Sequence, residues 1–262
     1  MTTPAGANVL ITGSGAGIGA ALARRFAAEG ARVVVNDLNA DAAHAVAAEF
    51  GGIALPGDAA GEEGVAALIA GARTALGGEI DVYCANAGIA EGLGLDASEQ
   101  TWDRSWDVNV MAHVRAARLL TPAWLARGRG HLVSTVSAAG LLTMLDGTAY
   151  AVTKHAAYAF AEWMAITYGA KGITVQAVCP LGVRTALLDA SGTAARLILD
   201  DGAIEPEEVA DVVVGAVAAG DPFLILPHPE VARMYANRAA DPDRWLAGMR
   251  KLQARLDAVD EG

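Results

Sequence analysis

The stretch NVLITGSGAGIG, residues 8–19, passes from an apolar run into a glycine-rich loop and then into a helical pattern. The apolar run predicts a buried strand, and the alanine-rich residues that follow the loop predict a helix. Gly13 and Gly17 permit a tight turn between the two, and Gly19 permits close packing of the helix on the strand. A helix that begins directly after such a loop offers free N–H groups to a pyrophosphate. We therefore predict a dinucleotide site; a turn that is merely rich in small residues is the alternative.

The same alternation of apolar runs and alanine-rich helical patterns continues along the chain. The runs are nearly continuous rather than alternating, which is typical of a parallel sheet that helices cover on both faces. We predict an α/β fold, a Rossmann-like doubly wound sheet of about seven parallel strands. The predicted strands are 8–12, 32–37, 53–58, 80–86, 130–137, 173–180 and 223–228. The predicted helices include Ile18–Glu29, Trp102–Leu125 and Tyr150–Tyr168.

Length and composition predict one domain over residues 1–262, with a substrate lid at about 186–208 and a helical tail at about 229–262. The net charge of −11 and the pI of about 4.8 argue against nucleic acid as a partner. No apolar run is long enough to span a membrane, and the first eight residues lack the parts of a secretion signal. Cys84 and Cys179 lie in apolar runs and are interpreted as buried thiols. The expected compartment is the cytoplasm.

Asp37 ends the second predicted strand, roughly 20 residues beyond Gly19, at the spacing where a carboxylate binds a ribose diol. A carboxylate there repels a 2′-phosphate. Leu38, Ser14 and Ala16 supply no arginine or lysine, so the predicted cofactor is NAD rather than NADP. The alternative is an aspartate in a turn after the strand.

The ends of the third and fourth predicted strands also carry candidate cofactor contacts. Asp58 closes the third strand and could accept a hydrogen bond from an adenine amino group, and the run ANAG at 85–88 closes the fourth. Gly88 allows the backbone to approach a cofactor closely. Each signal is weak alone, but all of them fall where open α/β sheets bind their ligands.

The run YAVTK places Tyr150 and Lys154 one helical turn apart, on the same face of a helix. A phenol with a pKa of ~10 is a poor base near neutral pH, and a nearby ammonium lowers that value. The remaining N–H donors of Lys154 are free for the nicotinamide ribose. Ser137 ends the fifth predicted strand and can converge on the same crevice.

These motifs, with Asn109 in WDVNVMAH and PLGVRT at 180–185, resemble the short-chain dehydrogenase/reductase family in its NAD-binding single-domain form, over residues 8 to about 228. The resemblance implies a catalytic tetrad in which Tyr150 is the acid or base, Ser137 polarises the carbonyl oxygen, Lys154 supports both, and Asn109 orders a water that relays protons. It also implies hydride transfer between the nicotinamide and a carbonyl or alcohol carbon. The candidate cofactor-binding residues are Gly13, Ser14, Gly17, Ile18, Gly19, Asp37, Leu38, Asp58, Ala59, Asn86, Ala87, Gly88, Tyr150, Lys154, Pro180, Val183 and Thr185.

The chain departs from the family pattern at two places. Leu181 stands directly after Pro180, where members commonly have glycine, and the chain after residue 228 runs on as a helical pattern instead of a glycine-pair segment. Purely structural roles remain the alternative for the tetrad: a locally satisfied tyrosine, a strand-end serine, a packing asparagine and a solvated lysine. The five histidines show no metal-binding spacing, so no metal is expected.

The expected substrate is a neutral, bulky secondary alcohol or its ketone, because the residues that should wall its site are mostly apolar. These residues are Ala138, Leu141, Met144, Leu145, Leu181, Leu187, Leu188, Leu197 and Ile198. Arg184 is either a substrate contact or an exposed lid charge. Apolar residues around helices 102–125 and 150–168 predict a homodimer or homotetramer. A non-catalytic NAD-binding sensor and an adenosylmethionine-dependent methyltransferase are the competing functions.

Overall fold

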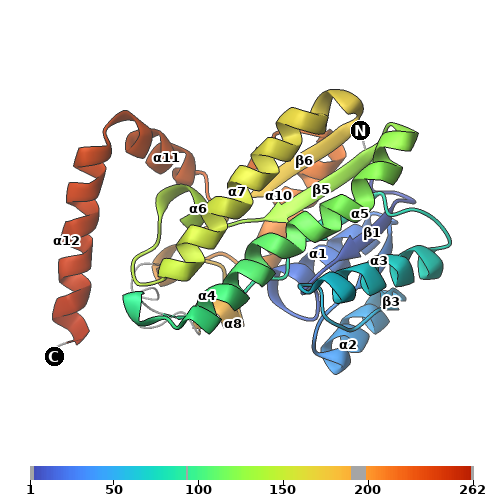
Figure 1. Cartoon of the computed structure of the whole chain (residues 1–262), viewed down its shortest axis with the longest axis horizontal. Coiled ribbons are helices and arrows are strands. Elements are labelled where there is room, and N and C mark those ends of the chain that lie inside the picture. The colour runs from blue at the N-terminus through green and yellow to red at the C-terminus, as the bar shows by residue number, and fades with distance from the viewer. Residues whose placement is uncertain (1–2, 93, 190–198, 261–262) are drawn as a thin grey trace.

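The computed structural model describes residues 3–92, 94–189 and 199–260 and contains a sheet of seven parallel strands (Figure 1). The strand order is β3-β2-β1-β4-β5-β6-β7, so the chain winds outward from β1 in one direction and from β4 in the other. The predicted doubly wound α/β fold is confirmed. The strands are β1 (Asn8–Ile11), β2 (Arg32–Val35), β3 (Ile53–Ala54), β4 (Val82–Ala85), β5 (Gly130–Thr135), β6 (Ile173–Val178) and β7 (Leu224–Ile225).

Helices cover both faces of this sheet. The longer ones are α1 (Gly17–Ala28), α2 (Ala40–Phe50), α3 (Glu62–Leu76), α4 (Glu99–Trp106), α5 (Ala112–Arg127), α7 (Thr148–Tyr168), α10 (Pro206–Ala219), α11 (Glu230–Ala240) and α12 (Pro242–Asp260). Shorter helical segments are Gly94–Asp96, α6 (Ala139–Leu142), Gly169–Lys171, α8 (Ala186–Asp189) and Asp200–Gly202. None of these described helices combines the length and the apolar character needed to cross a membrane.

The sheet separates two hydrophobic cores. In β1, Val9 and Ile11 face the core beneath α1, α2 and α10, whereas Leu10 faces the core beneath α3, α5 and α7. This two-sided burial explains why the strands are continuous apolar runs. The extension of one domain over residues 1–262 stays a prediction, which the single sheet supports.

All seven strands are shorter than predicted. The run 53–58 contributes only Ile53 and Ala54 to the sheet, and the run 223–228 contributes only Leu224 and Ile225. The residues beyond each strand end, including Asp37 and Asp58, lie in loops, because the chain leaves the sheet there to form the crevice. The predicted helix Trp102–Leu125 is also two helices, α4 and α5, joined by a π-helical segment at Asp107–Met111.

The predicted lid at 186–208 is described only in part. It contains α8 and the segment Asp200–Gly202, and residues 190–198 lie outside the described residues. Its last residues belong to α10, which begins at Pro206 with a capping box between Glu205 and Glu208. Residues 229–262, the predicted tail, contain α11 and α12, and Figure 1 shows α12 at the edge of the molecule.

Candidate active site

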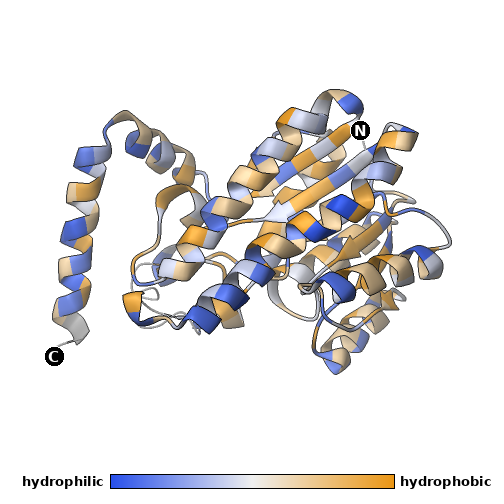
Figure 2. Cartoon of the chain, viewed as in Figure 1, coloured by the Kyte–Doolittle hydropathy of each residue, from blue (hydrophilic) through white to orange (hydrophobic). Residues whose placement is uncertain are grey.

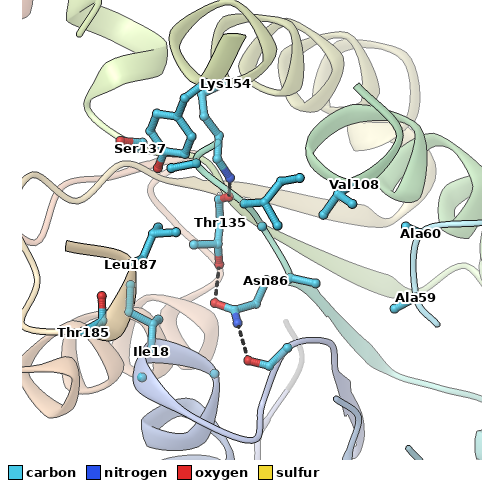
Figure 3. Close-up of a pocket in the computed structure, with 18 of the residues that line it drawn as sticks. Ile18, Ala59, Ala60, Asn86, Val108, Thr135, Ser137, Lys154, Thr185 and Leu187 are labelled. Carbon is cyan, nitrogen blue, oxygen red and sulfur yellow. Dashed lines mark hydrogen bonds between the residues drawn. The ribbon is translucent and has the colours of Figure 1, made fainter. Parts of the chain in front are cut away.

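A cavity of about 820 Å³ lies at the carboxyl ends of the strands, within the size range of small-molecule and cofactor sites. It runs from the glycine loop after β1 past the ends of β2 and β4 to α7. Every predicted cofactor-binding residue except Ser14 lines it, and so do Ser137, Tyr150 and Lys154. Figure 3 shows how residues from α1, the loop after β4, β5 and α7 converge there.

The glycine loop has a shape that side chains would fill. Gly13 has φ +60°, and a Cβ atom built on it would lie 2.8 Å from Cα of Ala87. A Cβ atom on Gly19 would lie 2.2 Å from the carbonyl oxygen of Gly13. The loop therefore fits a pyrophosphate that the backbone must approach closely.

Ser14 does not take the place predicted for it. Its hydroxyl donates to the carbonyl oxygen of Ile11 at 2.8 Å, and its N–H donates to the carbonyl oxygen of Asn36 at 2.8 Å. The side chain is fully buried between β1 and β2. Ser14 thus ties two strands together instead of facing the cavity, because both of its donors are already used.

Asp37 is held in position by its own surroundings. Its carboxylate accepts hydrogen bonds from the N–H groups of Gly15, at 3.0 Å, and Asn39, at 2.9 Å. Two carboxylate oxygens offer about four acceptor positions, so the side chain keeps capacity for a diol. Among the described residues that line the cavity, the basic ones are Arg104 and Lys154, and neither adjoins Asp37 in sequence.

Asp58 forms a turn after β3, which is the structural role that was the alternative for Asp37. Its carboxylate accepts hydrogen bonds from the N–H groups of Ala60, at 2.8 Å, and Gly61, at 2.9 Å, just before α3. This arrangement is an Asx-turn that leads to Gly61, the N-cap of α3. Asp58 also lines the cavity, so the turn leaves an adenine contact open.

Asn86 connects the glycine loop to the catalytic side of the cavity. Its amide group donates to the carbonyl oxygen of Gly13 at 3.1 Å, and its carbonyl oxygen accepts from the hydroxyl of Thr135 at 3.1 Å. The main-chain oxygen of Thr135 in turn accepts from Nζ of Lys154 at 2.9 Å. Figure 3 shows these bonds as one continuous chain. The two halves of the site are therefore positioned by a single network.

Ser137, Tyr150 and Lys154 meet at the end of β5. The phenol of Tyr150 is hydrogen-bonded to the hydroxyl of Ser137, which also accepts from the N–H of Ala139 at 3.1 Å. Nζ of Lys154 lies 5.7 Å from the centre of the Tyr150 ring. The helical spacing thus brings the phenol and the ammonium to one place, as predicted for residues i and i+4.

The pKa of Tyr150 differs from the expectation, and the pKa of Lys154 is shifted as well. Burial raises the pKa of Tyr150 above its ordinary value, and the hydrogen bond with Ser137 opposes that shift more weakly. Burial also lowers the pKa of Lys154 to about 8. The expected depression of the phenol pKa by Lys154 is absent from this arrangement, because the ammonium is directed to the Thr135 carbonyl and both groups are desolvated.

Asn109 does not line the cavity and is fully buried in the π-helical segment. Its amide group donates to the carbonyl oxygen of Ile89, at 2.9 Å, and to the hydroxyl of Thr153, at 3.0 Å. Its carbonyl oxygen accepts from the N–H of Ile89 at 3.0 Å. Both amide hydrogens are committed, so only acceptor capacity remains. A Cβ atom on Gly88 would lie 3.3 Å from that oxygen and 3.3 Å from Nζ of Lys154.

Part of the predicted substrate wall lines the cavity. Met144, Leu181, Leu187 and Leu188 line the cavity, whereas Ala138 and Leu141 are buried in the core beneath α7 and Leu145 is not part of the lining. Leu197 and Ile198 lie outside the described residues. Arg184 is an exposed charge that forms an ion pair with Glu205 at 3.1 Å.

Sequence reasoning missed the contribution of α4. One face of this helix lines the cavity, and Figure 2 shows α4 as predominantly hydrophilic. The lining residues from and just after α4 are Gln100, Asp103, Arg104, Asp107 and Val108. Their helical spacing was visible in the sequence, but nothing there indicated which face of the helix would turn toward the site.

Comparisons with known proteins agree with this geometry. The family model for short chain dehydrogenases matches residues 7–195. The chain is similar to mouse epidermal retinol dehydrogenase 2, with 33% identity over 85% of this chain and 74% of the relative. It is also similar to 1-deoxy-11-beta-hydroxypentalenate dehydrogenase of Streptomyces exfoliatus, with 36% identity over 80% of this chain and 79% of the relative.

A solved structure extends the likeness to three dimensions. A short chain dehydrogenase/reductase from Burkholderia phymatum, determined in complex with NAD, superimposes with a TM-score of 0.83. It shares 26% sequence identity and covers 93% of this chain and 96% of its own.

Proposed function

Because the chain belongs to the short-chain dehydrogenase family and is an oxidoreductase, we propose that it interconverts a bulky, neutral secondary alcohol and its ketone with NAD. The observation that carries this proposal is the convergence of Ser137, Tyr150 and Lys154 in the same cavity as the glycine loop. A protein that only sensed the cofactor would need the loop but not that triad.

The choice of NAD rests on Asp37. Its carboxylate is held at the cavity by two N–H groups and would repel a 2′-phosphate, while its free acceptor positions suit a ribose diol. The glycine loop would hold the pyrophosphate, and Lys154 would hold the second ribose. NAD supplies the nicotinamide carbon that accepts the hydride. The NAD complex of the Burkholderia phymatum structure supports this choice.

The residues of the chain handle the proton. Ser137 donates a hydrogen bond to the substrate oxygen, and Tyr150 removes the proton of the alcohol as general base. Burial raises the pKa of Tyr150 above its ordinary value. Nζ of Lys154 lies 5.7 Å from the centre of the Tyr150 ring, within reach of a proton relay from the phenol.

Asn109 can contribute to the proton relay in fewer ways than the resemblance implied. Its amide hydrogens already bind Ile89 and Thr153, so it can hold a relay water only by accepting from it. That acceptor lies close to Lys154, on the side of Gly88. We propose that the proton leaves Tyr150 by way of Lys154 and such a water.

The substrate class follows from the walls of the cavity. Met144, Leu181, Leu187, Leu188 and Leu199 present apolar surface, which favours a bulky alcohol with few charges. The names of two relatives refer to retinol and to a hydroxypentalenate, both bulky hydroxyl compounds, of which the second also carries a carboxylate.

We also propose that the enzyme is a homodimer or homotetramer that pairs through α5 and α7. Large apolar side chains are exposed on these helices, among them Leu119, Trp163 and Ile166, the last 77% exposed. Exposed apolar surface of this kind marks an interaction site. Sedimentation of the wild type and of Ile166→Glu tests the assembly; a monomeric wild type contradicts it.

The cytoplasm is the proposed compartment, supported by the buried free thiols Cys84 and Cys179.

The function is tested by following NADH formation over a panel of cyclic, aromatic and steroid secondary alcohols, with NAD and NADP in parallel. We expect turnover of at least one neutral cyclic alcohol with NAD and much slower turnover with NADP. Binding of NAD without oxidation of any alcohol or reduction of any matching ketone would instead support a cofactor sensor.

A further inference from the structure

We propose that His228 is a positioning residue that sets the Leu181 wall of the substrate site and joins it to the segment before α10. This inference rests on the proposed function, since it concerns how the same cavity binds its alcohol. His228 follows β7, outside the motifs of the catalytic site.

The imidazole of His228 is buried and bonded on both sides. Its Nδ1 atom accepts a hydrogen bond from the N–H of Leu181 at 3.1 Å. Because Nδ1 is the acceptor, the neutral ring carries its hydrogen on Nε2, which donates to the carbonyl oxygen of Gly202 at 3.2 Å. With only 2% of its surface exposed, the ring has no competing contact with bulk water. One tautomer therefore connects two separate segments.

The residue that His228 holds is part of the cavity wall. Leu181 lines the cavity between Pro180 and Val183. The carbonyl oxygen of Pro180 accepts from the N–H of Ala138 at 2.7 Å, so the preceding residue is anchored by the main chain. The N–H of Leu181 is bonded instead to a side chain, that of His228. The position of Leu181 thus depends on a group that can be changed by mutation.

The hydrogen bond from Nε2 to Gly202 links His228 to the segment that carries Leu199, another residue of the cavity wall. Gly182 accepts a hydrogen bond from the N–H of Ile204 at 3.1 Å, and its Cα packs so closely on Leu199 that a Cβ atom would lie 2.7 Å from the Leu199 carbonyl oxygen. Leu199 itself lines the cavity. By binding Gly202 as well as Leu181, His228 adds a side-chain link between the segments that carry Leu181 and Leu199, beside the main-chain bonds of Ile204 to Gly182 and Arg184.

Leu181 presents its side chain to the cavity, so its orientation decides the shape of that wall. A leucine in the wall has to be oriented, whereas a glycine would not, because only the leucine presents a side chain to the substrate. The histidine supplies that orientation.

Three variants separate the two bonds of the ring. His228→Asn places a carbonyl oxygen near the position of Nδ1 and so keeps the bond to Leu181. His228→Gln places an amide group near the position of Nε2 and so keeps the bond to Gly202. His228→Ala keeps neither bond. We expect the KM for the alcohol to rise about tenfold in His228→Ala and His228→Gln with kcat within about twofold, and to stay near the wild-type value in His228→Asn. The Kd for NAD should stay unchanged in all three.

Hydrogen exchange supplies a measurement that does not depend on activity. The amide of Leu181 should exchange faster in His228→Ala and His228→Gln and at the wild-type rate in His228→Asn. His131→Asn is the matched control: His131 is also buried and bonded, to Gln176 at 2.8 Å, but lies at the opposite end of β5. It should lower stability without changing the KM.

The outcomes are distinguishable. An unchanged KM in His228→Ala, or a failure of His228→Asn to restore both the KM and the protection of Leu181, overturns the inference. If His228→Ala does not fold, the comparison of His228→Asn with His228→Gln decides. A wild type that oxidises no alcohol refutes the proposed function instead, and the exchange of Leu181 then still tests the contact.

Discussion

The ammonium of Lys154 lies 5.7 Å from the centre of the Tyr150 ring and donates to the carbonyl oxygen of Thr135 at 2.9 Å. Only 3% of the lysine is exposed. A charge is therefore buried beside the proposed base and kept in place by a main-chain oxygen. The burial of such a charge costs folding free energy.

This cost predicts a pH dependence of stability. The pKa of Lys154 is lowered to about 8 in the folded chain and is close to 10.4 in an unfolded one. Below pH 8 both states hold the proton and the full penalty applies. Between pH 8 and about 10 the folded state releases the proton first, so stability rises with pH.

Lys154→Met removes this effect. We expect the unfolding free energy of the wild type, relative to Lys154→Met, to increase by about 2–3 kcal/mol between pH 7 and pH 10, at 1.36 kcal/mol per unit of pKa shift. Urea unfolding of both proteins across that range checks the difference. A difference that stays constant with pH would show that the lysine is not buried as a charge.

Asp37→Asn should change the choice of cofactor. The substitution keeps the size of the side chain but removes the charge that repels a 2′-phosphate. We expect kcat/KM with NAD to fall about 10- to 100-fold, as for the loss of a hydrogen bond to a charged group, and kcat/KM with NADP to rise.

The control is Asp41→Asn, an exposed carboxylate in the first turn of α2. It should leave the ratio of NAD to NADP unchanged. An unchanged ratio in Asp37→Asn would mean that another group selects the cofactor.

Gly19→Ala should disrupt the loop that opens α1. The new Cβ atom would lie 2.2 Å from the carbonyl oxygen of Gly13 and 2.6 Å from the amide nitrogen of Asn86. The new methyl group has no room, because backbone lies on one side of it and a hydrogen-bonded side chain on the other. We therefore expect the unfolding free energy to fall by about 1–3 kcal/mol. We also expect NAD binding to be lost.

Gly215→Ala is the matched control, because Gly215 lies inside α10 with no atom within 4 Å of its new Cβ. It should gain about 0.5–1 kcal/mol from helix propensity and bind NAD normally. Urea unfolding and NAD titration of both variants test the argument. Normal NAD binding by Gly19→Ala would refute it.

The fold and the main site residues could be predicted because their signals are local. Continuous apolar runs indicated the strands, and glycines next to a strand indicated the loop after β1. Tyr150 and Lys154 are one turn apart on one helix, so their proximity followed from spacing alone. In a parallel sheet, strand ends collect at one edge, which placed Asp37 and Ser137 near them.

Contacts between distant segments decided the remainder. Nothing near Ser14 in the sequence showed that both of its donors would be used by β1 and β2. The commitment of Asn109 to Ile89 and Thr153, and the bond between His228 and Leu181, join residues far apart in the chain. The raised pKa of Tyr150 likewise comes from burial, which depends on the whole fold.

The central claim is that Tyr150 is the acid–base group of an NAD-dependent dehydrogenase, and Tyr150→Phe tests it most directly. The substitution removes only the hydroxyl, so the ring and its contact with Lys154 remain. Using an alcohol that the wild type oxidises, we expect kcat to fall about 10²- to 10⁴-fold while the Kd for NAD stays within about twofold. Retention by Tyr150→Phe of more than a tenth of the wild-type kcat would contradict the account.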